Sequence, residues 1–206
     1  MAGRTIAIIG DSQADGLSRH LAAELARRRV GVVTGTTTVT GATTRVLLDR
    51  EKPQALMEQS DADLVIVALG GNDSAGSTYA RTLEQFVRAL RRSDGTMPEI
   101  VWIGPAYAER ADVDARHLVT SRVQASVLPG LGVRWYDSRE WTTDGPGAVH
   151  AGDGVHFTSD AYAHQATAVV DRILSQFPVA LVLGLVGGLA ALGGLVAASI
   201  AWEHRR

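Results

Sequence analysis

Two short stretches far apart in the chain contain residue types that together could carry nucleophilic catalysis. Ser12 follows Gly10 and Asp11 directly after an apolar run, and Asp153 stands three residues before His156. A carboxylate at this spacing on a turn can bond one imidazole nitrogen and leave the other for a serine hydroxyl. Each stretch also has an ordinary structural interpretation, because Ser and Asp commonly cap helices. The pattern predicts a nucleophile and its base only if the fold brings both stretches together.

Two further polar turns contain groups that could stabilise a developing negative charge. Asn72, within Gly70-Gly71-Asn72-Asp73, could donate a side-chain N–H to an oxyanion, a contribution worth about 3–4 kcal/mol in comparable sites. Gly41, within Val39-Thr40-Gly41-Ala42-Thr43, could supply a backbone N–H. Either stretch alone is typical of a simple glycine turn. Both become candidates for an oxyanion hole if they lie beside Ser12.

The elements that must position these turns can be read from the apolar pattern. Five apolar runs bounded by turn residues predict strands, at Thr5–Ile9, Val30–Thr34, Leu64–Leu69, Ile100–Ile103 and Val133–Tyr136. The segments between them have helical spacing, and continuous apolar strands that alternate with helices favour a parallel sheet covered on both faces. Ligands bind such sheets at the carboxyl ends of the strands. The four polar turns follow different strands, so we expect them at one edge of the sheet.

Together the four turns resemble the motif blocks of the SGNH hydrolase family, also called GDSL-type esterases. The first block matches Gly10-Asp11-Ser12, the second Gly41, the third Gly70-x-Asn72-Asp73 and the fifth Asp153-x-x-His156. The resemblance extends from residue 5 to about residue 175. Gln13 stands where the family nickname has Leu, at a position that is not catalytic in the family.

The resemblance implies an α/β fold with three flavodoxin-like layers and a five-stranded parallel sheet in the order 2-1-3-4-5. It implies hydrolysis of an ester or thioester, without a metal or another cofactor. Ser12 would be the nucleophile, His156 the general base and Asp153 the group that orients the imidazole. The oxyanion hole would consist of the Ser12 and Gly41 N–H groups and the Asn72 amide. A small acyl ester or an O-acylated carbohydrate is favoured over a bilayer lipid.

Two alternatives share this scaffold. An acyltransferase would use the same triad if an acceptor alcohol, rather than water, reached the acyl-enzyme. A non-catalytic, membrane-anchored binding module is disfavoured, because every expected reactive residue is present. The loops Ser74–Thr78, Tyr107–Asp112 and Arg139–Gly154 are expected to select the acyl and leaving groups. Trp141 could line that pocket or pack beneath a long loop.

Composition excludes several other classes of function. The 206 residues contain 20 Lys and Arg against 22 Asp and Glu, so no broad basic surface for nucleic acid is expected. The absence of cysteine excludes disulfides, thiolate metal sites and a cysteine nucleophile. No set of His, Asp and Glu has a convincing metal-ligand spacing. We expect His20 and His117 to be solvated and His150 to be exposed.

The sequence divides into a hydrolase domain at 1–177, an apolar segment at 178–202 and a polar tail at 203–206. The 25 residues of the apolar segment carry no charge and, as a helix, would extend about 37 Å, enough to cross a hydrocarbon core of about 30 Å. The alternative is a very apolar core helix. Small residues four apart, such as Gly184 and Gly188, would allow self-association of the span.

The orientation of this membrane anchor is predicted by two conflicting signals. Arg205 and Arg206 favour a cytoplasmic tail and an external domain, whereas the start of the chain lacks the pattern of a signal peptide. Giving the second signal more weight predicts a single-pass C-terminal anchor with a cytoplasmic catalytic domain. The last helix before the span should run antiparallel to the strands, so the catalytic mouth should point away from the bilayer.

Overall fold

The computed structural model describes residues 3–175 of the chain. One compact unit extends to Asp171, and a second begins at Arg172, of which only Arg172–Ser175 are described. Among the described residues no helix is both long and apolar enough to cross a membrane. The predicted span at 178–202 and the tail at 203–206 lie outside the described residues.

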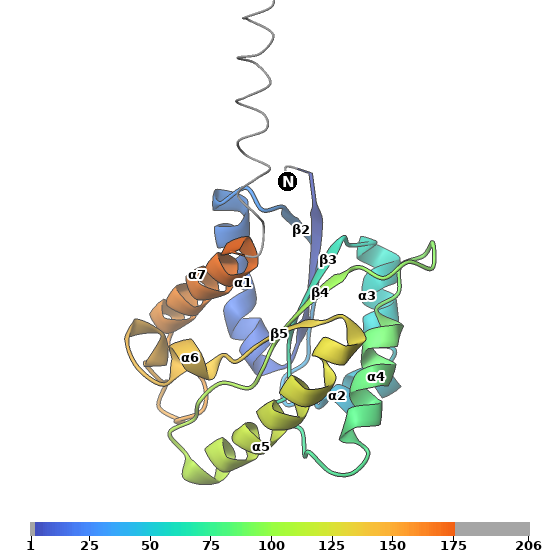
Figure 1. Ribbon diagram of the computed structural model, residues 1–206. Helices are drawn as coiled ribbons and strands as arrows, with labels where there is room; N and C mark the ends of the chain where they lie inside the picture. The colour runs from blue at the N-terminus through green and yellow to red at the C-terminus, as the bar shows by residue number, and fades with distance from the viewer. Residues whose placement is uncertain (1–2, 176–206) are drawn as a thin grey trace, which may run out of the picture. The chain divides into compact units, whose positions relative to one another are not determined.

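A single sheet of five parallel strands forms the centre of the unit (Figure 1). The strands are β1 (Thr5–Gly10), β2 (Val32–Thr38), β3 (Leu64–Ala68), β4 (Glu99–Ile103) and β5 (Arg134–Tyr136). Their order in the sheet is β2-β1-β3-β4-β5, which confirms the predicted order. The carboxyl ends of β1, β3 and β4 therefore lie side by side.

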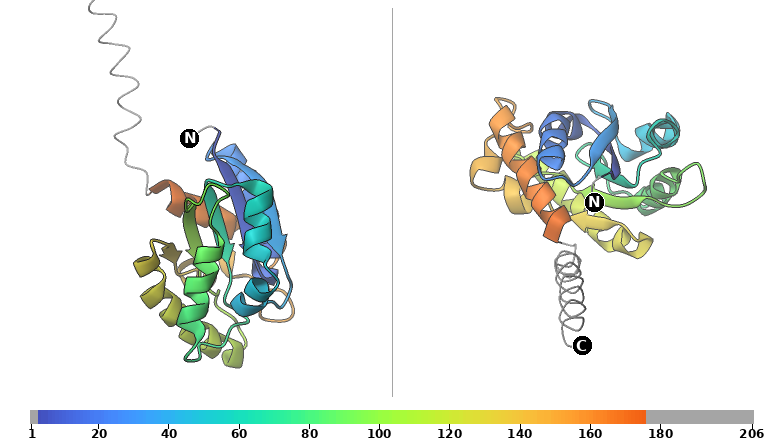
Figure 2. Two further views of the ribbon diagram at one scale, coloured as in Figure 1. Left: turned by 90° about the vertical axis from the view of Figure 1, so that its right-hand side faces the viewer. Right: turned by 90° about the horizontal axis from the view of Figure 1, so that it is seen from above.

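Helices cover both faces of this sheet, as the two further views show (Figure 2). The α-helices are α1 (Ser12–Arg27), α2 (Thr44–Asp49), α3 (Lys52–Ser60), α4 (Tyr79–Ala89), α5 (Ala111–Val127), α6 (Arg139–Thr142) and α7 (Ser159–Ser175). Short 3-10 turns, η1 (Pro129–Leu131) and η2 (Pro146–Ala148), follow α5 and α6. Helices α1 and α7 lie on one face of the sheet, and α3 and α4 lie on the other (Figure 1).

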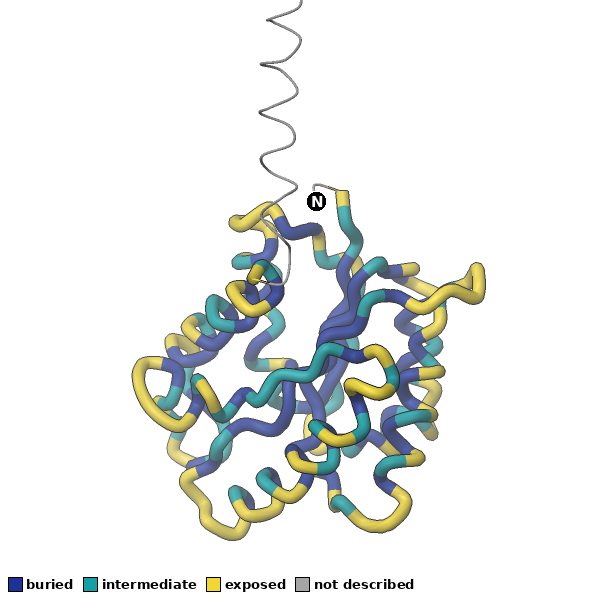
Figure 3. The backbone as a smooth tube through the Cα atoms, viewed as in Figure 1, coloured by how far each residue is buried: buried dark blue, intermediate teal, exposed yellow. Residues whose placement is uncertain are grey.

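The core lies on both faces of the three central strands (Figure 3). On the side of α3 and α4, a hydrophobic cluster joins alternate residues of β1, β3 and β4 to apolar helix residues such as Phe86. The ring of Phe86 packs edge-on against Trp102 of β4, with 5.4 Å between the ring centroids. Burial on both faces explains why β1 and β3 are continuous apolar runs.

The edge strand β2 differs from its prediction. It runs from Val32 to Thr38 rather than from Val30 to Thr34, and its residues alternate between exposed and partly buried. An edge strand has one neighbour and one half-buried face, so its residues need not form an apolar run. The threonine-rich stretch at 36–38 suits a strand because threonine is β-branched.

The segment between β2 and β3 forms two helices, where the apolar pattern predicts one interrupted stripe. Glu51 separates α2 from α3 and has a left-handed backbone conformation with φ of 51°. Pro53 lies in the first turn of α3, where a missing N–H removes no intrahelical hydrogen bond.

The turn from β1 into α1 is fixed by close backbone packing. A Cβ atom on Gly10 would lie 1.9 Å from the carbonyl oxygen of Ala68, so only glycine fits at this position. Asp11 is the N-cap of α1, and its Oδ1 accepts a 2.9 Å hydrogen bond from the backbone N–H of Gln13. Helix α1 therefore begins at Ser12.

Candidate active site

A chain of hydrogen-bonded side chains lies at the carboxyl edge of the sheet. The Oγ atom of Ser12 is 2.8 Å from Nε2 of His156, and Nδ1 of the same imidazole is 2.5 Å from Oδ2 of Asp153. Ser12 comes from the start of α1 and the other two residues from the loop before α7. The fold thus joins the two stretches that carry the nucleophile and base pattern.

The local conformation of the loop orients the carboxylate of Asp153. Its Oδ1 accepts hydrogen bonds from the backbone N–H groups of Val155 and His156, at 3.0 and 2.9 Å, which leaves Oδ2 facing the imidazole. Gly154 has a φ of 66°, a conformation that glycine adopts without strain. The hydrogen bond from His156, with those two N–H groups, holds the pKa of Asp153 well below its usual range. An ionised Asp153 favours the tautomer whose bare Nε2 faces Ser12.

Gln13 connects this loop to the start of α1. Its amide nitrogen donates to the carbonyl of Val155 at 3.0 Å, and its amide oxygen accepts from the hydroxyl of Tyr162 on α7 at 2.8 Å. The sequence assigned no role to Gln13, because both partners lie more than 140 residues away along the chain. Its contacts fix the distance between the elements that carry Ser12 and His156.

The two candidate oxyanion donors lie beside Ser12, in the same hollow. The amide nitrogen of Asn72 donates to Oδ2 of Asp11 and to the carbonyl of Ala42, both at 3.2 Å. Since both partners are acceptors, they fix which side of the amide carries the N–H groups. The backbone N–H of Gly41 donates to no other described residue, and its φ of 72° suits glycine.

Two buried carboxylates flank Asn72. Asp11 is 1% exposed, and burial raises its pKa to about 6 against the lowering effect of the Gln13 N–H. Asp73 is 3% exposed and accepts hydrogen bonds from the N–H and the hydroxyl of Thr44, the latter at 2.7 Å. Burial also raises the pKa of Asp73.

Helix α5 supports the loop of Asn72 through buried polar side chains. The prediction that His117 is solvated is wrong: it is 2% exposed, with Nδ1 2.7 Å from the carbonyl oxygen of Ala106 and Nε2 3.0 Å from that of Gly71. Two helical turns further along α5, the amide of Gln124 donates to the carbonyl of Leu69 at 2.9 Å. The fully buried positions of α5 are therefore mostly polar, while Val123 and Val127 are partly buried and pack against the core.

The other described histidines lie away from the catalytic hollow. The side chain of His150 is 2% exposed, which contradicts the expected exposure, and its ring lies 4.3 Å from that of Phe157. His20 is half-buried, with Nε2 3.2 Å from the hydroxyl of Ser159. Within residues 3–175, no three His, Asp or Glu side chains are grouped so that they could hold a metal ion.

The hollow that contains Ser12 and His156 has a volume of about 230 Å³. Most residues that line it have polar or charged side chains, and Val113 and Val155 are its two aliphatic residues. The 107–112 loop contributes Arg110 to it, and residues 139–154 contribute nothing. The 74–78 loop instead lines a neighbouring hollow of about 560 Å³ that shares Asn72.

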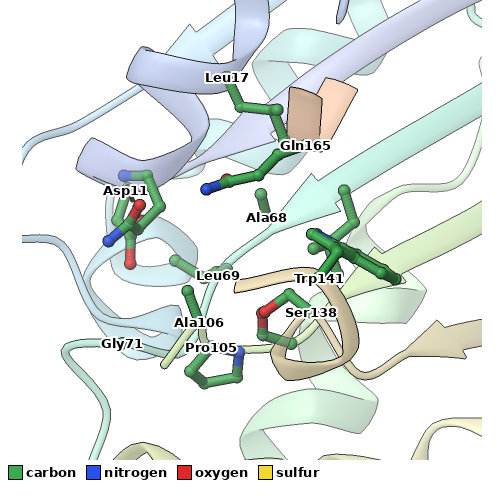
Figure 4. A pocket seen from close by; sticks show the side chains of 13 residues that line it. Asp11, Leu17, Ala68, Leu69, Gly71, Pro105, Ala106, Ser138, Trp141 and Gln165 are labelled. Carbon is green, nitrogen blue, oxygen red and sulfur yellow. Dashed lines mark hydrogen bonds between the residues drawn. The ribbon is translucent and has the colours of Figure 1, made fainter. Parts of the chain in front are cut away.

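Trp141 lines a separate small cavity rather than the catalytic hollow (Figure 4). This cavity of about 30 Å³ is lined by Asp11, Ser138 and Gln165, among other residues. Its volume is enough for one or two water molecules and too small for an acyl chain. Trp141 thus lines a cavity that shares Asp11, Gln13 and Gly71 with the catalytic hollow, but it does not line that hollow itself.

The family that matches this chain supports a carboxylic ester hydrolase. Residues 7–164 match the GDSL-like lipase/acylhydrolase family, and the chain belongs to that family. This finding agrees with the family resemblance of the four sequence blocks. No curated protein sequence matches the chain significantly.

Solved structures with the same fold include several acylhydrolases. The lipase/acylhydrolase from Enterococcus faecalis has a TM-score of 0.65 and 22% identity, over 82% of this chain and 95% of that one. A catalytic mutant of Axe2, an acetylxylan esterase from Geobacillus stearothermophilus, has a TM-score of 0.66 and 17% identity, over 83% and 94% of the two chains. TesA has a TM-score of 0.62 and 22% identity, over 82% and 97%. At these identities the likeness establishes the fold.

Proposed function

We propose that the protein is a serine hydrolase that cleaves small acyl esters, including acyl groups on carbohydrate hydroxyls, through an acyl-enzyme on Ser12. The observation that carries this proposal is the continuous chain of hydrogen bonds from the Ser12 hydroxyl through His156 to Asp153, with lengths of 2.8 and 2.5 Å.

In the proposed mechanism, the Oγ atom of Ser12 attacks the ester carbonyl while Nε2 of His156 takes the hydroxyl proton. Asp153 keeps the other imidazole proton on Nδ1 and stabilises the imidazolium that forms. His156 then returns its proton to the leaving alcohol as the C–O bond breaks. Water attacks the acyl-enzyme by the same proton transfers and releases the acid.

The negative charge on the tetrahedral intermediate would be stabilised by the N–H groups of Ser12 and Gly41 and by the amide of Asn72. The Gly41 N–H has no competing partner among the described residues. The amide of Asn72 holds its two acceptors at 3.2 Å, near the long end of the range for such bonds. An oxyanion would therefore compete with weak existing hydrogen bonds.

The size and polarity of the hollow favour a short acyl group. A volume of about 230 Å³, in which Val113 and Val155 are the only aliphatic side chains of the lining, leaves little room for a long acyl chain. The acetylxylan esterase among the structural relatives agrees with an acylated carbohydrate as substrate. Both water and an acceptor alcohol could reach the acyl-enzyme in this open site. We propose hydrolysis rather than acyl transfer, because hydrolysis needs no binding site for an acceptor.

The test uses the full-length protein with p-nitrophenyl esters of increasing acyl length. We expect turnover of acetate and butyrate esters, a steep fall in kcat/KM for long chains, and covalent labelling of Ser12 by a fluorophosphonate. The Ser12→Ala variant should lose both labelling and turnover, by a factor of about 10³ or more, and keep its circular dichroism spectrum. Turnover that survives in Ser12→Ala, or a fluorophosphonate adduct on another residue, would refute the proposed nucleophile.

A further inference from the structure

The charged residues around the catalytic hollow are unevenly distributed. Arg110 and Arg116 line the hollow that contains Ser12, and both side chains are exposed. Arg45 and Arg81, also exposed, line the neighbouring hollow. The two hollows meet at Asn72, a candidate oxyanion donor.

The acidic residues that line the same two hollows do not offset these cations at the surface. They are Asp11 and Asp73, which are 1% and 3% exposed and are hydrogen-bonded to protein groups. A substrate entering from solvent therefore meets the guanidinium groups of the lining, while the exposed carboxylate of Asp153 next to the hollow is hydrogen-bonded to His156. The chain as a whole has a formal charge of −2, so this excess of positive charge is local.

Two of the four arginines lack an acidic partner. Arg110 pairs with Asp112 at 3.0 Å and Arg45 with Asp49 at 2.9 Å. In the part of the chain that the structure describes, Arg116 forms no salt bridge or side-chain hydrogen bond, and neither does Arg81. A guanidinium without a protein partner keeps all its donors for a ligand, and its planar fork fits a carboxylate or phosphate.

We propose that the substrate carries an anionic group, a carboxylate or phosphate, close to its scissile ester, and that Arg116 binds this group. Arg81 extends the same cationic lining beyond Asn72 and would contact a longer acidic substrate. This inference rests on the proposed esterase function and specifies its substrate class. It assigns to α5 a role in specificity in addition to its support of the Asn72 loop.

The experiment compares matched charged and neutral esters, with the anion on either side of the ester bond. The acyl-side pair is the p-nitrophenyl monoester of succinate and p-nitrophenyl butyrate. The alcohol-side pair is 4-carboxyphenyl acetate and 4-carbamoylphenyl acetate. The measured quantity is the ratio of kcat/KM for the charged ester to that for the neutral one, in the full-length protein.

We expect at least one pair to give a ratio that falls about three- to tenfold in Arg116→Gln, the range of an exposed charge-assisted contact. The matched control is Arg88→Gln, which removes the same charge from an exposed position of α4 that lines neither hollow. This control should leave the ratio unchanged. Sodium chloride at about 0.5 M should lower the ratio of the wild type, because salt screens exposed charges.

A binding measurement separates failure of this inference from failure of the proposed function. Calorimetry with Ser12→Ala and Ser12→Ala/Arg116→Gln gives affinities for the same esters without turnover. Weaker binding of the charged ester in the double variant supports the inference even if no ester is cleaved. The inference is overturned if the kcat/KM ratio and the affinity ratio of both pairs are the same with and without Arg116, or if Arg88→Gln lowers them equally.

Discussion

Asp11 combines two structural roles at the turn that carries Ser12. One carboxylate oxygen caps α1, and the other holds the amide of Asn72. Both contacts favour the ionised form, yet burial opposes it more strongly and raises the pKa to about 6. Asp11 therefore changes charge near neutral pH while it lies between the nucleophile turn and a candidate oxyanion donor.

This raised pKa predicts how stability depends on pH. Because the folded chain binds the Asp11 proton more tightly than the unfolded chain, the carboxyl stabilises the fold at low pH and loses that effect as pH rises through about 6. Between pH 5 and 7.5 the loss should be about 1 kcal/mol in the free energy of unfolding. Urea denaturation of wild type and Asp11→Asn at both pH values measures it. An equal pH dependence in the two proteins would contradict the raised pKa.

At the scale of the element, α5 fixes the loop after β3 by a row of buried polar contacts. Each ring nitrogen of His117 faces a carbonyl oxygen, at 2.7 and 3.0 Å, and Gln124 adds a third carbonyl contact. Burial lowers the pKa of His117, which the two carbonyl contacts offset in part. The helix thus supplies donors to carbonyls beside the bend at Gly70–Asp73: Gln124 donates to Leu69, and the single N–H of a neutral His117 imidazole donates to Gly71 or Ala106.

Loss of this imidazole should affect both stability and catalysis. A neutral imidazole donates through only one ring nitrogen, so His117→Ala leaves one buried carbonyl without its donor, and we expect a loss of about 1–3 kcal/mol in the free energy of unfolding. The looser Asn72 loop should also lower kcat more than it raises KM, because oxyanion contacts act in the transition state. Urea denaturation and steady-state kinetics measure the two effects.

Val119→Ala is the matched control for this helix, since Val119 is 49% exposed on the same element. This variant should leave both the free energy of unfolding and kcat close to their wild-type values. A His117→Ala protein with unchanged kcat would mean that the Asn72 loop holds its shape without α5.

At the scale of the whole molecule, α1 and α7 both begin at the catalytic edge. Near their far ends, Arg28 forms an ion pair with Asp171, so this part of α7 lies at the edge opposite Ser12. This arrangement agrees with the topological expectation for the last helix. That the mouth of the site points away from a bilayer stays a prediction, because residues 178–202 are outside the described part of the chain.

We propose that residues 178–202 anchor the protein in a membrane, and this is testable without knowing their structure. Leu189→Lys places a charge at the centre of the apolar segment, which costs about 2.5–3.5 kcal/mol in a spanning helix. In flotation with phospholipid vesicles, the full-length wild type and the control Leu189→Ile should float, and Leu189→Lys should do so far less. If all three proteins float equally, or if none of them floats, the proposal that residues 178–202 anchor the protein is refuted.

The three central strands were predicted within one residue at most ends, because burial on both faces leaves a continuous apolar run. The edge strand β2 was predicted at the wrong residues, because a strand with one neighbour and one half-buried face does not need a continuous apolar run. The buried polar side chains of α5 were not predicted. Its polar side chains are buried because they bind carbonyls of a loop some 50 residues earlier, a partner that helical spacing along the chain does not reveal.

The sequence by itself determined the class of fold, the strand order through the family resemblance, and the identity of the residues with reactive side chains. These follow from local patterns, since an apolar run and a short motif each occupy a few adjacent residues. Only the tertiary structure decided that Gln13 joins two catalytic elements, that His117 is buried, and that the unpaired Arg116 lines the site. Those properties depend on which distant segments meet at the edge of the sheet, and the physical cause is packing between elements rather than any pattern within one.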